Sequence, residues 1–353
     1  MACQYKRILV TRLKYIGDVV LTTPVIRSIR TACPHAFIAY LGEASAVSLL
    51  EHNPFLDEII PFDFSRPSLL EQLRVVRLLR RRRFDLVIDL FSNPRSALLT
   101  YLSGSPMRVG LERKGRGRLY TVRVTPDAEL KTAIEFHHQF LRAAGIQAFT
   151  STTELFLTES ERRAADDYLL RLIGEKDQRV EHAKFIGIHP GATWPAKRWL
   201  PERFAELATR LAQRTGAHIL ITAGPKDGEV VREVLQRATT ELHVLEALPL
   251  RQLASIIARC ALFVSNDAAP MHIAAAVGTP TIGLFGPGEE AIWFPYPQQG
   301  GHLALRKEVP CHPCHLDVCN RAGNGYMECM RLLTVDDVVN AAGLGLAVGR
   351  DLH

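Results

Sequence analysis

The stretch Asp85-Leu86-Val87-Ile88-Asp89-Leu90 decides the fold of the first half of the chain, because it is an almost continuous apolar run of strand length. Runs of this kind are typical of parallel sheets, whose central strands are buried on both faces. Outward from it, short apolar runs alternate with amphipathic stretches, beginning with Arg7-Ile8-Leu9-Val10. The alternation of strand and helix predicts an α/β fold built on a doubly wound parallel sheet.

The stretch that precedes this strand predicts an amphipathic helix over 68–82. Its apolar side chains recur with a period near 3.6 residues, which predicts one apolar face along the helix. The residues of that face are Leu69, Leu70, Leu73, Val76 and Leu79.

The strand–helix alternation restarts after a polar stretch, 175–184, with the strand Phe185-Ile186-Gly187-Ile188. A length of 353 residues also suits about two domains. We therefore expect two doubly wound, Rossmann-like domains, 1–175 and 185–333, that face a central cleft. A helix within 334–353 would then pack back across that cleft.

The composition excludes several classes of protein. The chain is 47% apolar and 23% charged, as in average soluble domains, which argues against a disordered chain, a collagen and a coiled coil. No apolar run approaches the ~18 residues of a membrane-spanning helix, and the N-terminus lacks the apolar core of a signal peptide. We expect a cytoplasmic protein.

The positive charge lies in the first half of the chain. Residues 1–150 carry a balance of +9 and residues 151–353 a balance of −3, which leaves +6 overall. The basic residues are densest in two runs, 80–83 and 113–118. Such a half attracts anionic partners, and either run alone also suits a solvated helix end. No RNA-recognition, helix-turn-helix or zinc-finger signature supports a nucleic acid as that partner.

The loop after the first strand, Thr11 to Val20, carries a carboxylate at Asp18 beside Gly17. Asp18 stands where the helix that we expect over 18–30 begins, so it suits an N-cap. Because loops after parallel strands lie at the carboxyl edge of the sheet, where ligands bind, Asp18 also suits a base for a sugar hydroxyl.

In the second half, the strand 185–188 runs into a loop over 189–199 that combines Gly191, Thr193, Lys197 and Arg198. A glycine lets the backbone approach a ligand closely, and a hydroxyl with two cations suits phosphate. The alternative is a turn anchored by tryptophan with solvated basic side chains. No Walker A motif is present.

The strand 261–264 runs into Asn266-Asp267 and then into a helix that we expect to begin near Ala268. Free N–H groups at such a helix start form an anion site. Asp267 could cap the helix or accept bonds from sugar hydroxyls. His272, one turn into the helix, suits a ligand contact or a structural role.

Four cysteines lie late in the chain, interleaved with histidines. Their spacing resembles a zinc site only in its first pair, so we favour reduced thiols that order a loop over a structural metal. The four are Cys311, Cys314, Cys319 and Cys329.

Together these motifs resemble the ADP-heptose:lipopolysaccharide heptosyltransferases, which are family-9 glycosyltransferases of GT-B fold. The resemblance covers nearly the whole chain, and the late cysteines also occur in many members. The most specific motifs are Arg12-x4-Gly17-Asp18-x3-Thr22-Thr23-Pro24, His189-Pro190-Gly191 with Lys197-x-Trp199, and Asn266-Asp267-x3-His272-x-Ala274-Ala275.

The resemblance implies roles for the strand-end residues. Asp18 would be the general base, and Thr193 and Lys197 would hold the donor diphosphate. Some members carry two threonines at this loop where this chain has Ala192-Thr193, so a backbone group could replace one hydroxyl contact.

The remaining donor contacts implied by the resemblance surround the sugar, the phosphates and the nucleoside. The segment around Leu248 would lie against adenine, and either Asp227 or Glu229 would bind the ribose. The sugar and phosphates would contact Asp267, Ala268, Ala269 and His272. On the acceptor side we assign Arg12, Lys14, Arg113 and Arg116.

The implied reaction is inverting transfer of L-glycero-D-manno-heptose from ADP-heptose to the lipopolysaccharide inner core, with Kdo-lipid A or heptosyl-Kdo-lipid A as acceptor. No metal or other cofactor is required. We expect a monomer that touches the cytoplasmic face of the inner membrane. The alternatives are another GT-B sugar-nucleotide enzyme, such as one with a different donor or an epimerase, and a non-catalytic binding protein of lipopolysaccharide assembly.

Overall fold

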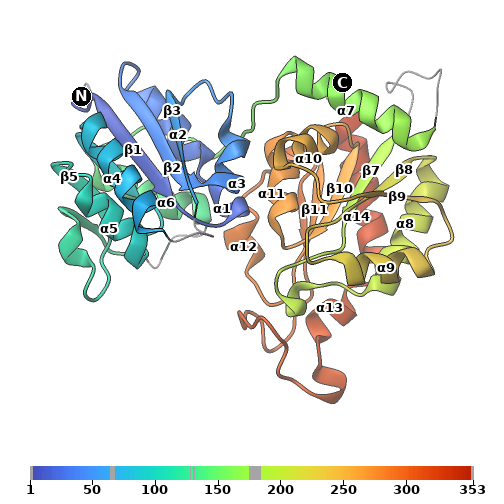
Figure 1. Cartoon of the computed structure of the whole chain (residues 1–353). Coiled ribbons are helices and arrows are strands. Elements are labelled where there is room, and N and C mark those ends of the chain that lie inside the picture. Colours follow the sequence, from blue (N-terminus) through green and yellow to red (C-terminus); the bar gives the residue numbers. More distant parts are fainter. Residues whose placement is uncertain (1–2, 64–67, 128, 130–131, 175–183, 351–353) are drawn as a thin grey trace. The chain divides into compact units, whose positions relative to one another are not determined.

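The computed structural model describes residues 3–63, 68–127, 129, 132–174 and 184–350. The chain forms two compact units, residues 1–156 and 157–353 (Figure 1). Each unit is an α/β layer structure around one parallel sheet, which confirms the fold class expected from the alternating pattern.

The first sheet has six parallel strands in the order β3-β2-β1-β4-β5-β6. Its centre is formed by β1 and β4, in which Ile8 pairs with Leu86 and Val10 with Ile88. All four residues of β4 are buried, as its apolar run predicts. The strands are β1 (Arg7–Arg12), β2 (Phe37–Glu43), β3 (Glu58–Phe62), β4 (Leu86–Asp89), β5 (Met107–Leu111) and β6 (Val122–Val124).

Helices cover both faces of the first sheet. One face packs against α1, α2, α3 and α6, and the other against α4 and α5, which lie side by side. The bounds are α1 (Ile16–Val20), α2 (Thr23–Ala32), α3 (Ala44–Val47), α4 (Leu69–Arg82), α5 (Pro94–Leu102) and α6 (Ala133–Ala143), with short 3₁₀ turns η1 (Ser48–Leu50) and η2 (Gly117–Leu119).

The helix expected over 18–30 is two helices. α1 ends at Val20 and α2 begins at Thr23, with Pro24 in its first turn. Proline has no N–H to donate and favours a helix start, so the chain turns there and begins a new helix.

The helix expected over 68–82 is present as α4, and Ser68 caps it by accepting from the N–H of Leu70 at 3.1 Å. The expected apolar face is wrong in its phase. Val75 and Leu79 are buried, whereas Leu69, Leu70 and Leu73 are 77%, 77% and 46% exposed.

The second sheet repeats the topology of the first. Its order is β12-β11-β10-β7-β8-β9, so the first strand of the unit, β7, again lies beside the fourth, β10. This is the strand order of a Rossmann fold, in which the order reverses between these two strands. The strands are β7 (Phe185–His189), β8 (His218–Thr222), β9 (Leu242–Leu245), β10 (Leu262–Asn266), β11 (Thr281–Leu284) and β12 (Leu303–Leu305).

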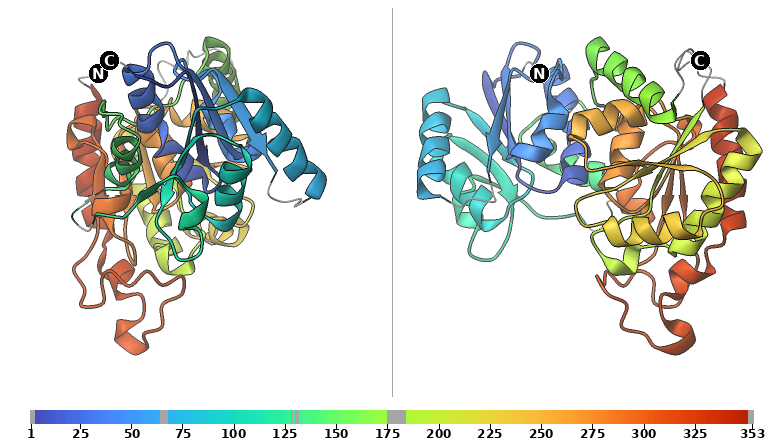
Figure 2. Two further views of the ribbon diagram at one scale, coloured as in Figure 1. Left: turned by 90° about the vertical axis from the view of Figure 1, so that its left-hand side faces the viewer. Right: turned by 45° about the vertical axis from the view of Figure 1, so that its right-hand side comes forward.

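The helices of the second unit also lie on both faces of their sheet, as Figure 2 shows. α8, α9 and α14 cover one face, and α7, α10 and α11 the other. The bounds are α7 (Glu159–Ile173), α8 (Pro201–Thr215), α9 (Gly228–Arg237), α10 (Leu250–Ile257), α11 (Ala269–Ala276), α12 (Glu290–Trp293), α13 (Glu328–Leu332) and α14 (Val335–Arg350), with 3₁₀ turns η4 (Pro195–Lys197), η5 (Gln298–Gly300) and η6 (Gly323–Gly325).

The boundary between the units differs from the expected one, which placed residues up to 175 in the first domain. α7 belongs to the second unit, because its Ala165 and Leu169 are buried in one cluster with Phe185 and Leu220. Most of the polar stretch 175–184, at which we expect a linker, lies outside the described residues, because these leave out 175–183.

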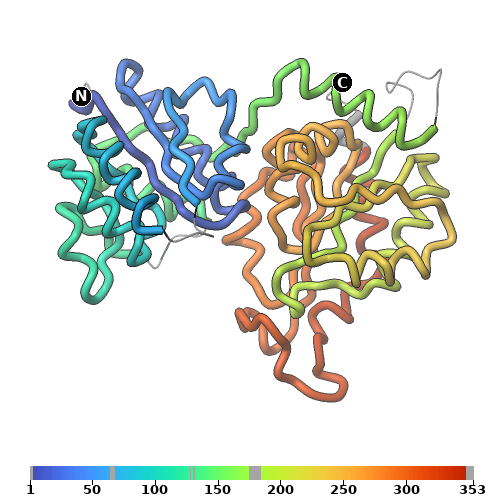
Figure 3. The backbone as a smooth tube through the Cα atoms, viewed as in Figure 1, coloured from blue at the N-terminus to red at the C-terminus, as the bar shows by residue number. Residues whose placement is uncertain are grey.

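The C-terminal helix α14 packs on the sheet of its own unit. Val338, Val339 and Ala342 are buried together with Leu262 and Leu284 of the second sheet. The apolar face of this helix is therefore used within the second unit, and its packing across a cleft stays a prediction. Between β12 and α14 the chain makes a long excursion that Figure 3 traces in orange and red.

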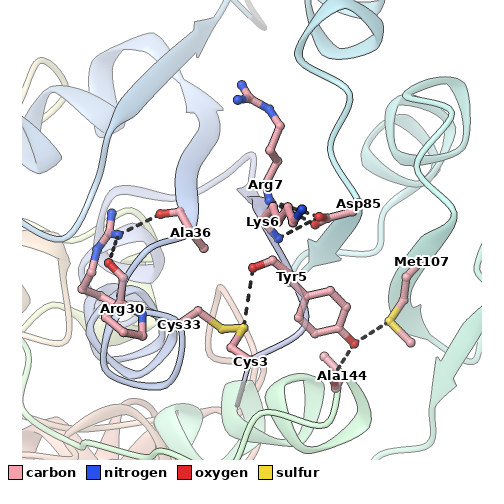
Figure 4. Close-up of a disulfide and its surroundings, with 11 residues drawn as sticks. Cys3, Tyr5, Lys6, Arg7, Arg30, Cys33, Ala36, Asp85, Met107 and Ala144 are labelled. Atoms are coloured by element: carbon pink, nitrogen blue, oxygen red, sulfur yellow. Dashed lines mark hydrogen bonds between the residues drawn. A yellow bond between two sulfur atoms is a disulfide. The ribbon is translucent and has the colours of Figure 1, made fainter.

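A disulfide joins Cys3 to Cys33, a feature that the expectation of a cytoplasmic protein did not include. It links the segment before β1 to the residue that ends α2 (Figure 4). The same segment is held by Tyr5, whose hydroxyl donates to the carbonyl oxygen of Ala144 at 2.7 Å. Both contacts fix the start of the first sheet.

Over the described ranges, no helix is both long and apolar enough to cross a bilayer. The longest, α14, has 16 residues, and a spanning helix needs about 20.

Candidate functional site

The carboxyl end of β1 carries an ion pair between Arg12 and Asp18. Arg12 is the last residue of β1, and its Nη1 also donates to the carbonyl oxygen of Leu90 at 2.8 Å, beyond the end of β4. The guanidinium lies 4.7 Å from the centre of the Phe91 ring. Arg12 therefore ties both central strand ends together and fixes the Asp18 carboxylate between them.

Asp18 is not the N-cap that its position suggested. The N-cap of α1 is Tyr15, and Asp18 lies three residues further, where its Oδ2 accepts from the Tyr15 N–H at 3.4 Å. Its side chain is 17% exposed and that of Arg12 is 12% exposed. A carboxylate that is fixed by a guanidinium and still reachable from solvent is suited to accept a proton from a ligand.

Asp89, at the end of β4, is a buried carboxylate that the sequence analysis did not single out. It accepts from the Tyr120 hydroxyl at 2.7 Å and from the N–H groups of Ser92 and Phe91 at 2.9 and 3.1 Å. Burial raises its pKa, against these hydrogen bonds. The sequence signal that could have identified Asp89 is a carboxylate within an otherwise apolar strand.

The Asp89–Tyr120 bond anchors the basic segment 113–118, which directly precedes Tyr120. The Tyr120 ring lies over Gly110, where a Cβ would come within 2.2 Å of the ring. Arg113 is exposed, Arg116 is half-buried, and Lys14 is half-buried in the loop after β1. The predicted acceptor residues thus all belong to the first unit, at the end of β1 and on the loops that follow β1 and β5.

In the second unit, Asn266 joins the loops after β7 and β10. Its Nδ2 donates to the carbonyl oxygens of Pro190 and Gly191 at 2.8 and 3.3 Å, and its Oδ1 accepts from the Trp199 N–H at 3.0 Å. The Asn266 side chain is fully buried and thus provides hydrogen-bond partners for backbone groups of the loop that begins with His189-Pro190-Gly191. The two motifs are brought together at the point where the strand order reverses, as expected for a ligand site.

Lys197 and Asp267 form an ion pair at this point, with 2.6 Å between Nζ and Oδ2. The Lys197 ammonium also lies 4.6 Å from the centre of the Trp194 ring. The Lys197 side chain is 20% exposed and that of Asp267 is 7% exposed. Thr193, in the same loop, is exposed. The loop thus carries one cation and one hydroxyl, two groups that suit phosphate.

α11 begins directly after Asp267, with Ala268 as its N-cap and Ala269 as its first residue. Ala268 has no side-chain oxygen, so no side-chain cap accepts from the first N–H groups of the helix. His272 lies one turn further and is buried, and its Nδ1 is 2.6 Å from the Tyr296 hydroxyl. Burial raises the pKa of Tyr296, so that hydroxyl keeps its proton.

Of the two candidate ribose ligands, Asp227 has a structural role. It is 7% exposed, its Oδ2 accepts from the Gly224 N–H at 2.8 Å, and it lies 3.9 Å from His189 Nε2. A Cβ at Gly191 would come within 2.3 Å of its carboxylate. Glu229, in the first turn of α9, is exposed. Leu248 packs partly buried against the cluster around Leu245.

The cysteine segment packs onto the loops that carry Lys197 and Asp267. The Ala196 N–H donates to the carbonyl oxygen of Asp317 at 3.0 Å. The N–H groups of Cys314 and His315 donate to the carbonyl oxygen of Pro287 at 3.2 and 3.0 Å. Gly288 in turn lies so close to Asp267 that a Cβ would be 3.1 Å from its Oδ2.

The four late cysteines carry free thiols. The Arg321 guanidinium donates to Cys311 Sγ and the Met327 N–H to Cys319 Sγ, both at 3.3 Å. Among the residues that the structure describes, no three His, Cys, Asp or Glu side chains are arranged to hold a metal ion.

Two Rossmann-like units, each with polar groups where its strand order reverses, define a glycosyltransferase of the GT-B fold. Residues 72–322 match the family described as glycosyltransferase family 9 (heptosyltransferase). The chain belongs to this family, and it is a glycosyltransferase.

Named relatives agree with this assignment. The chain is 28% identical to lipopolysaccharide heptosyltransferase 2 of Escherichia coli over 297 residues, which covers 80% of this chain and 83% of the relative. It is 27% identical to lipopolysaccharide heptosyltransferase 1 of Pseudomonas aeruginosa over 334 residues, which covers 89% of this chain and 87% of the relative.

Solved structures extend the similarity to nearly the full length. A family-9 glycosyltransferase from Veillonella parvula superposes with a TM-score of 0.83 at 27% identity, covering 98% of this chain and 99% of the other. The ADP-heptose lps heptosyltransferase II of Escherichia coli has a TM-score of 0.78 at 25% identity, covering 97% and 98%.

Proposed function

We propose that the protein transfers L-glycero-D-manno-heptose from ADP-heptose to the inner core of lipopolysaccharide, with inversion at the anomeric carbon. The observation that carries the proposal is the Lys197–Asp267 pair beside the start of α11, where the second strand order reverses. A cation and a row of helix N–H groups suit the diphosphate of a sugar nucleotide. The relatives named as lipopolysaccharide heptosyltransferases support heptose as the sugar.

The donor is proposed to bind the second unit. Lys197 and Thr193 hold the diphosphate, the N–H groups of Ala268 and Ala269 take further phosphate oxygens, and Asp267 accepts from sugar hydroxyls. His272, held by Tyr296, supports the α11 end of the site. When the bond between the anomeric carbon and the β-phosphate oxygen breaks, negative charge grows on ADP, and Lys197 with the helix start stabilises it.

For the ribose we favour Glu229 over Asp227. Asp227 already accepts from Gly224 and lies against Gly191, so a ribose contact would disrupt the loop that carries the donor motif. Glu229 is exposed at the start of α9, so a ribose contact there would leave the loop around Gly191 intact. Adenine is proposed to lie near Leu248.

The acceptor is proposed to bind the first unit. Asp18 removes the proton from the acceptor hydroxyl, the oxygen attacks the anomeric carbon, and ADP leaves in the same displacement. Arg12 orients Asp18 through their ion pair. The anionic groups of a Kdo-lipid A or heptosyl-Kdo-lipid A acceptor would be bound by Lys14, Arg113 and Arg116. The reaction as written uses no metal or other cofactor.

We also propose that the enzyme acts as a monomer at the cytoplasmic face of the inner membrane, without nucleic acid. Nothing in the chemistry above needs a second copy, and the basic first unit suits an anionic lipid-linked acceptor.

A panel of nucleotide sugars, combined with a panel of truncated lipopolysaccharide acceptors, tests the function by mass spectrometry of the products. The proposal requires a product one heptose heavier from ADP-heptose and an inner-core acceptor. A changed sugar nucleotide without acceptor would indicate an epimerase instead. Binding of both substrates with no product from any pair would indicate an assembly protein.

A further inference from the structure

The outer face of the α4–α5 layer carries exposed leucines that the proposed reaction does not use. Leu69 and Leu70 are each 77% exposed and Leu73 is 46% exposed, all within the first two turns of α4. Leu73 is three residues from Leu70 and four from Leu69, so it neighbours both on the helix surface and the three leucines form one patch. Scattered exposed leucines are ordinary, but a cluster of this kind marks an interaction surface.

The leucine patch lies at the ligand-binding edge of the first sheet. α4 follows β3, so its first turns lie at the carboxyl edge, and the Arg74 guanidinium holds them there by donating to the carbonyl oxygen of Pro61 at 3.2 Å. Asp18 follows β1 and lies at the same edge of the same parallel sheet. A partner bound by the patch is therefore held on the acceptor side of the first unit.

The rest of the exposed face of α4 is basic. Arg77, Arg80 and Arg81 are exposed in the turns that follow the leucines. The helix contains five arginines and a single acid, Glu71, which pairs with Arg74 at 2.6 Å. Exposed leucines beside exposed arginines combine two interactions that hold a protein on an anionic membrane, because apolar side chains enter the headgroup boundary and basic side chains attract acidic headgroups.

The neighbouring helix adds exposed apolar side chains beside the arginine end of α4, where Arg80 Nε donates to the carbonyl oxygen of Leu102 at 2.8 Å. On α5, which packs beside α4 in the same layer, Leu98 is 43% and Tyr101 49% exposed. Tyrosine is favoured at membrane interfaces because its ring is apolar and its hydroxyl is polar.

We propose that this α4–α5 face is a docking surface for a bilayer of anionic phospholipid. The side chains of Leu69, Leu70 and Leu73 enter the boundary between headgroups and acyl chains, and Arg77 and Arg81 contact lipid phosphates. The charge favours an anionic partner over a second copy of the chain, whose matching face would carry the same excess of arginine. The proposal goes beyond the heptosyl transfer proposed above and does not depend on it.

The test is co-flotation of the full-length protein with large unilamellar vesicles, either pure phosphatidylcholine or phosphatidylcholine with a quarter phosphatidylglycerol. The apolar variant carries Leu69→Gln, Leu70→Gln and Leu73→Gln, and the basic variant carries Arg77→Gln and Arg81→Gln. These side chains are exposed, so the fold should tolerate the changes. The matched control carries Leu235→Gln and Leu344→Gln, two exposed leucines of the second unit.

We expect the wild type to bind the anionic vesicles at least about tenfold more tightly than the neutral ones. The apolar variant should lose about tenfold or more of that affinity, the basic variant should lose most of the salt dependence, and the control should stay within about twofold of wild type.

Three results would overturn the proposal. The wild type could fail to bind vesicles, or bind both kinds equally, or the apolar variant could bind as well as the control. If the wild type fails to float and light scattering shows that it is a dimer which the apolar variant dissociates, the face is an interface between copies instead. Because the vesicles contain no acceptor and the readout is flotation, these results are independent of whether heptose is transferred.

Discussion

The ammonium group of Lys197 lies 2.6 Å from the carboxylate of Asp267, so the loops after β7 and β10 meet through one ion pair. The two residues are far apart in sequence. They meet because β7 and β10, the strands before their loops, are adjacent and parallel. A diphosphate that binds there has to compete with Asp267 for the ammonium. In the proposed donor site, the pair would therefore set how strongly the donor phosphates are held.

Replacing Lys197 by glutamine should lower kcat/KM for the sugar nucleotide by about a hundredfold, because the charge that stabilises the leaving diphosphate is lost. Steady-state kinetics with varied donor measures this. Lys226→Gln, which removes an exposed lysine of the same unit, is the matched control and should leave kcat/KM unchanged. An unchanged kcat/KM in the Lys197 variant would remove this residue from the donor site.

Replacing Gly191 by alanine should destabilise the second unit by about 1–3 kcal/mol, because the new methyl group would lie 2.3 Å from the buried Asp227 carboxylate. Urea denaturation gives the free energy of unfolding. Gly228→Ala is the control, since a Cβ there meets no atom within 4 Å. Equal stability of the two variants would contradict the contact described for Asp227.

The stability of the first unit should fall as the pH falls below about 6.5. His137 is buried in α6, and burial lowers its pKa to about 3. The unfolded state, with an ordinary histidine, binds a proton between these two values while the folded state does not. Acid therefore favours unfolding, by about 1.4 kcal/mol per pH unit within that window for one such group.

The measurement is the melting temperature of the wild type and of His137→Gln between pH 7 and pH 5. Glutamine does not titrate, so the variant should lose less stability on acidification than the wild type. Parallel curves would show that His137 does not supply the pH dependence.

Breaking the Cys3–Cys33 disulfide should lower the stability of the first unit. The disulfide joins two residues with a sequence separation of 30. In the chain-entropy description, closing a loop of this length contributes about 3–4 kcal/mol to the free energy of unfolding. Cys33→Ser should melt at a lower temperature than oxidised wild type, and only the wild type should respond to dithiothreitol.

Thiol titration under non-reducing conditions provides the check on that bridge. The chain has seven cysteines, and five of them are free in the structure. Titration of the unfolded, unreduced protein should therefore find five thiols. Seven thiols would mean that the bridge does not form.

The strand-end motifs were predictable because each polar group directly follows an apolar run. A parallel sheet brings such ends to one edge, and in the structure Asn266 and Asp267 contact the loop after β7 there. Asp89 was missed because its carboxylate lies within the apolar run itself, and the Tyr120 hydroxyl that it binds is 31 residues away. No local pattern reports a partner at that separation.

The phase of α4 could not be read from periodicity alone. Leu69, Leu70 and Leu73 follow the helical repeat with Leu79, yet the structure buries Val75 and Leu79 and leaves the three leucines exposed. Periodicity finds an apolar stripe but does not say which partner covers it. The same reason explains α7, whose apolar positions did not reveal which of the two sheets they pack against.

The central claim is tested most directly by following the reaction by NMR with the wild type and with Asp18→Asn. The measurement reports the anomeric configuration of the product and the turnover of each protein. The amide keeps the shape of the side chain but cannot take the proton of the acceptor hydroxyl. The account predicts a product with the configuration opposite to that of the ADP-heptose donor. It predicts that Asp18→Asn binds ADP within about twofold of wild type while kcat falls by about 10²–10⁴-fold. Retained configuration, or wild-type turnover in Asp18→Asn, would contradict it.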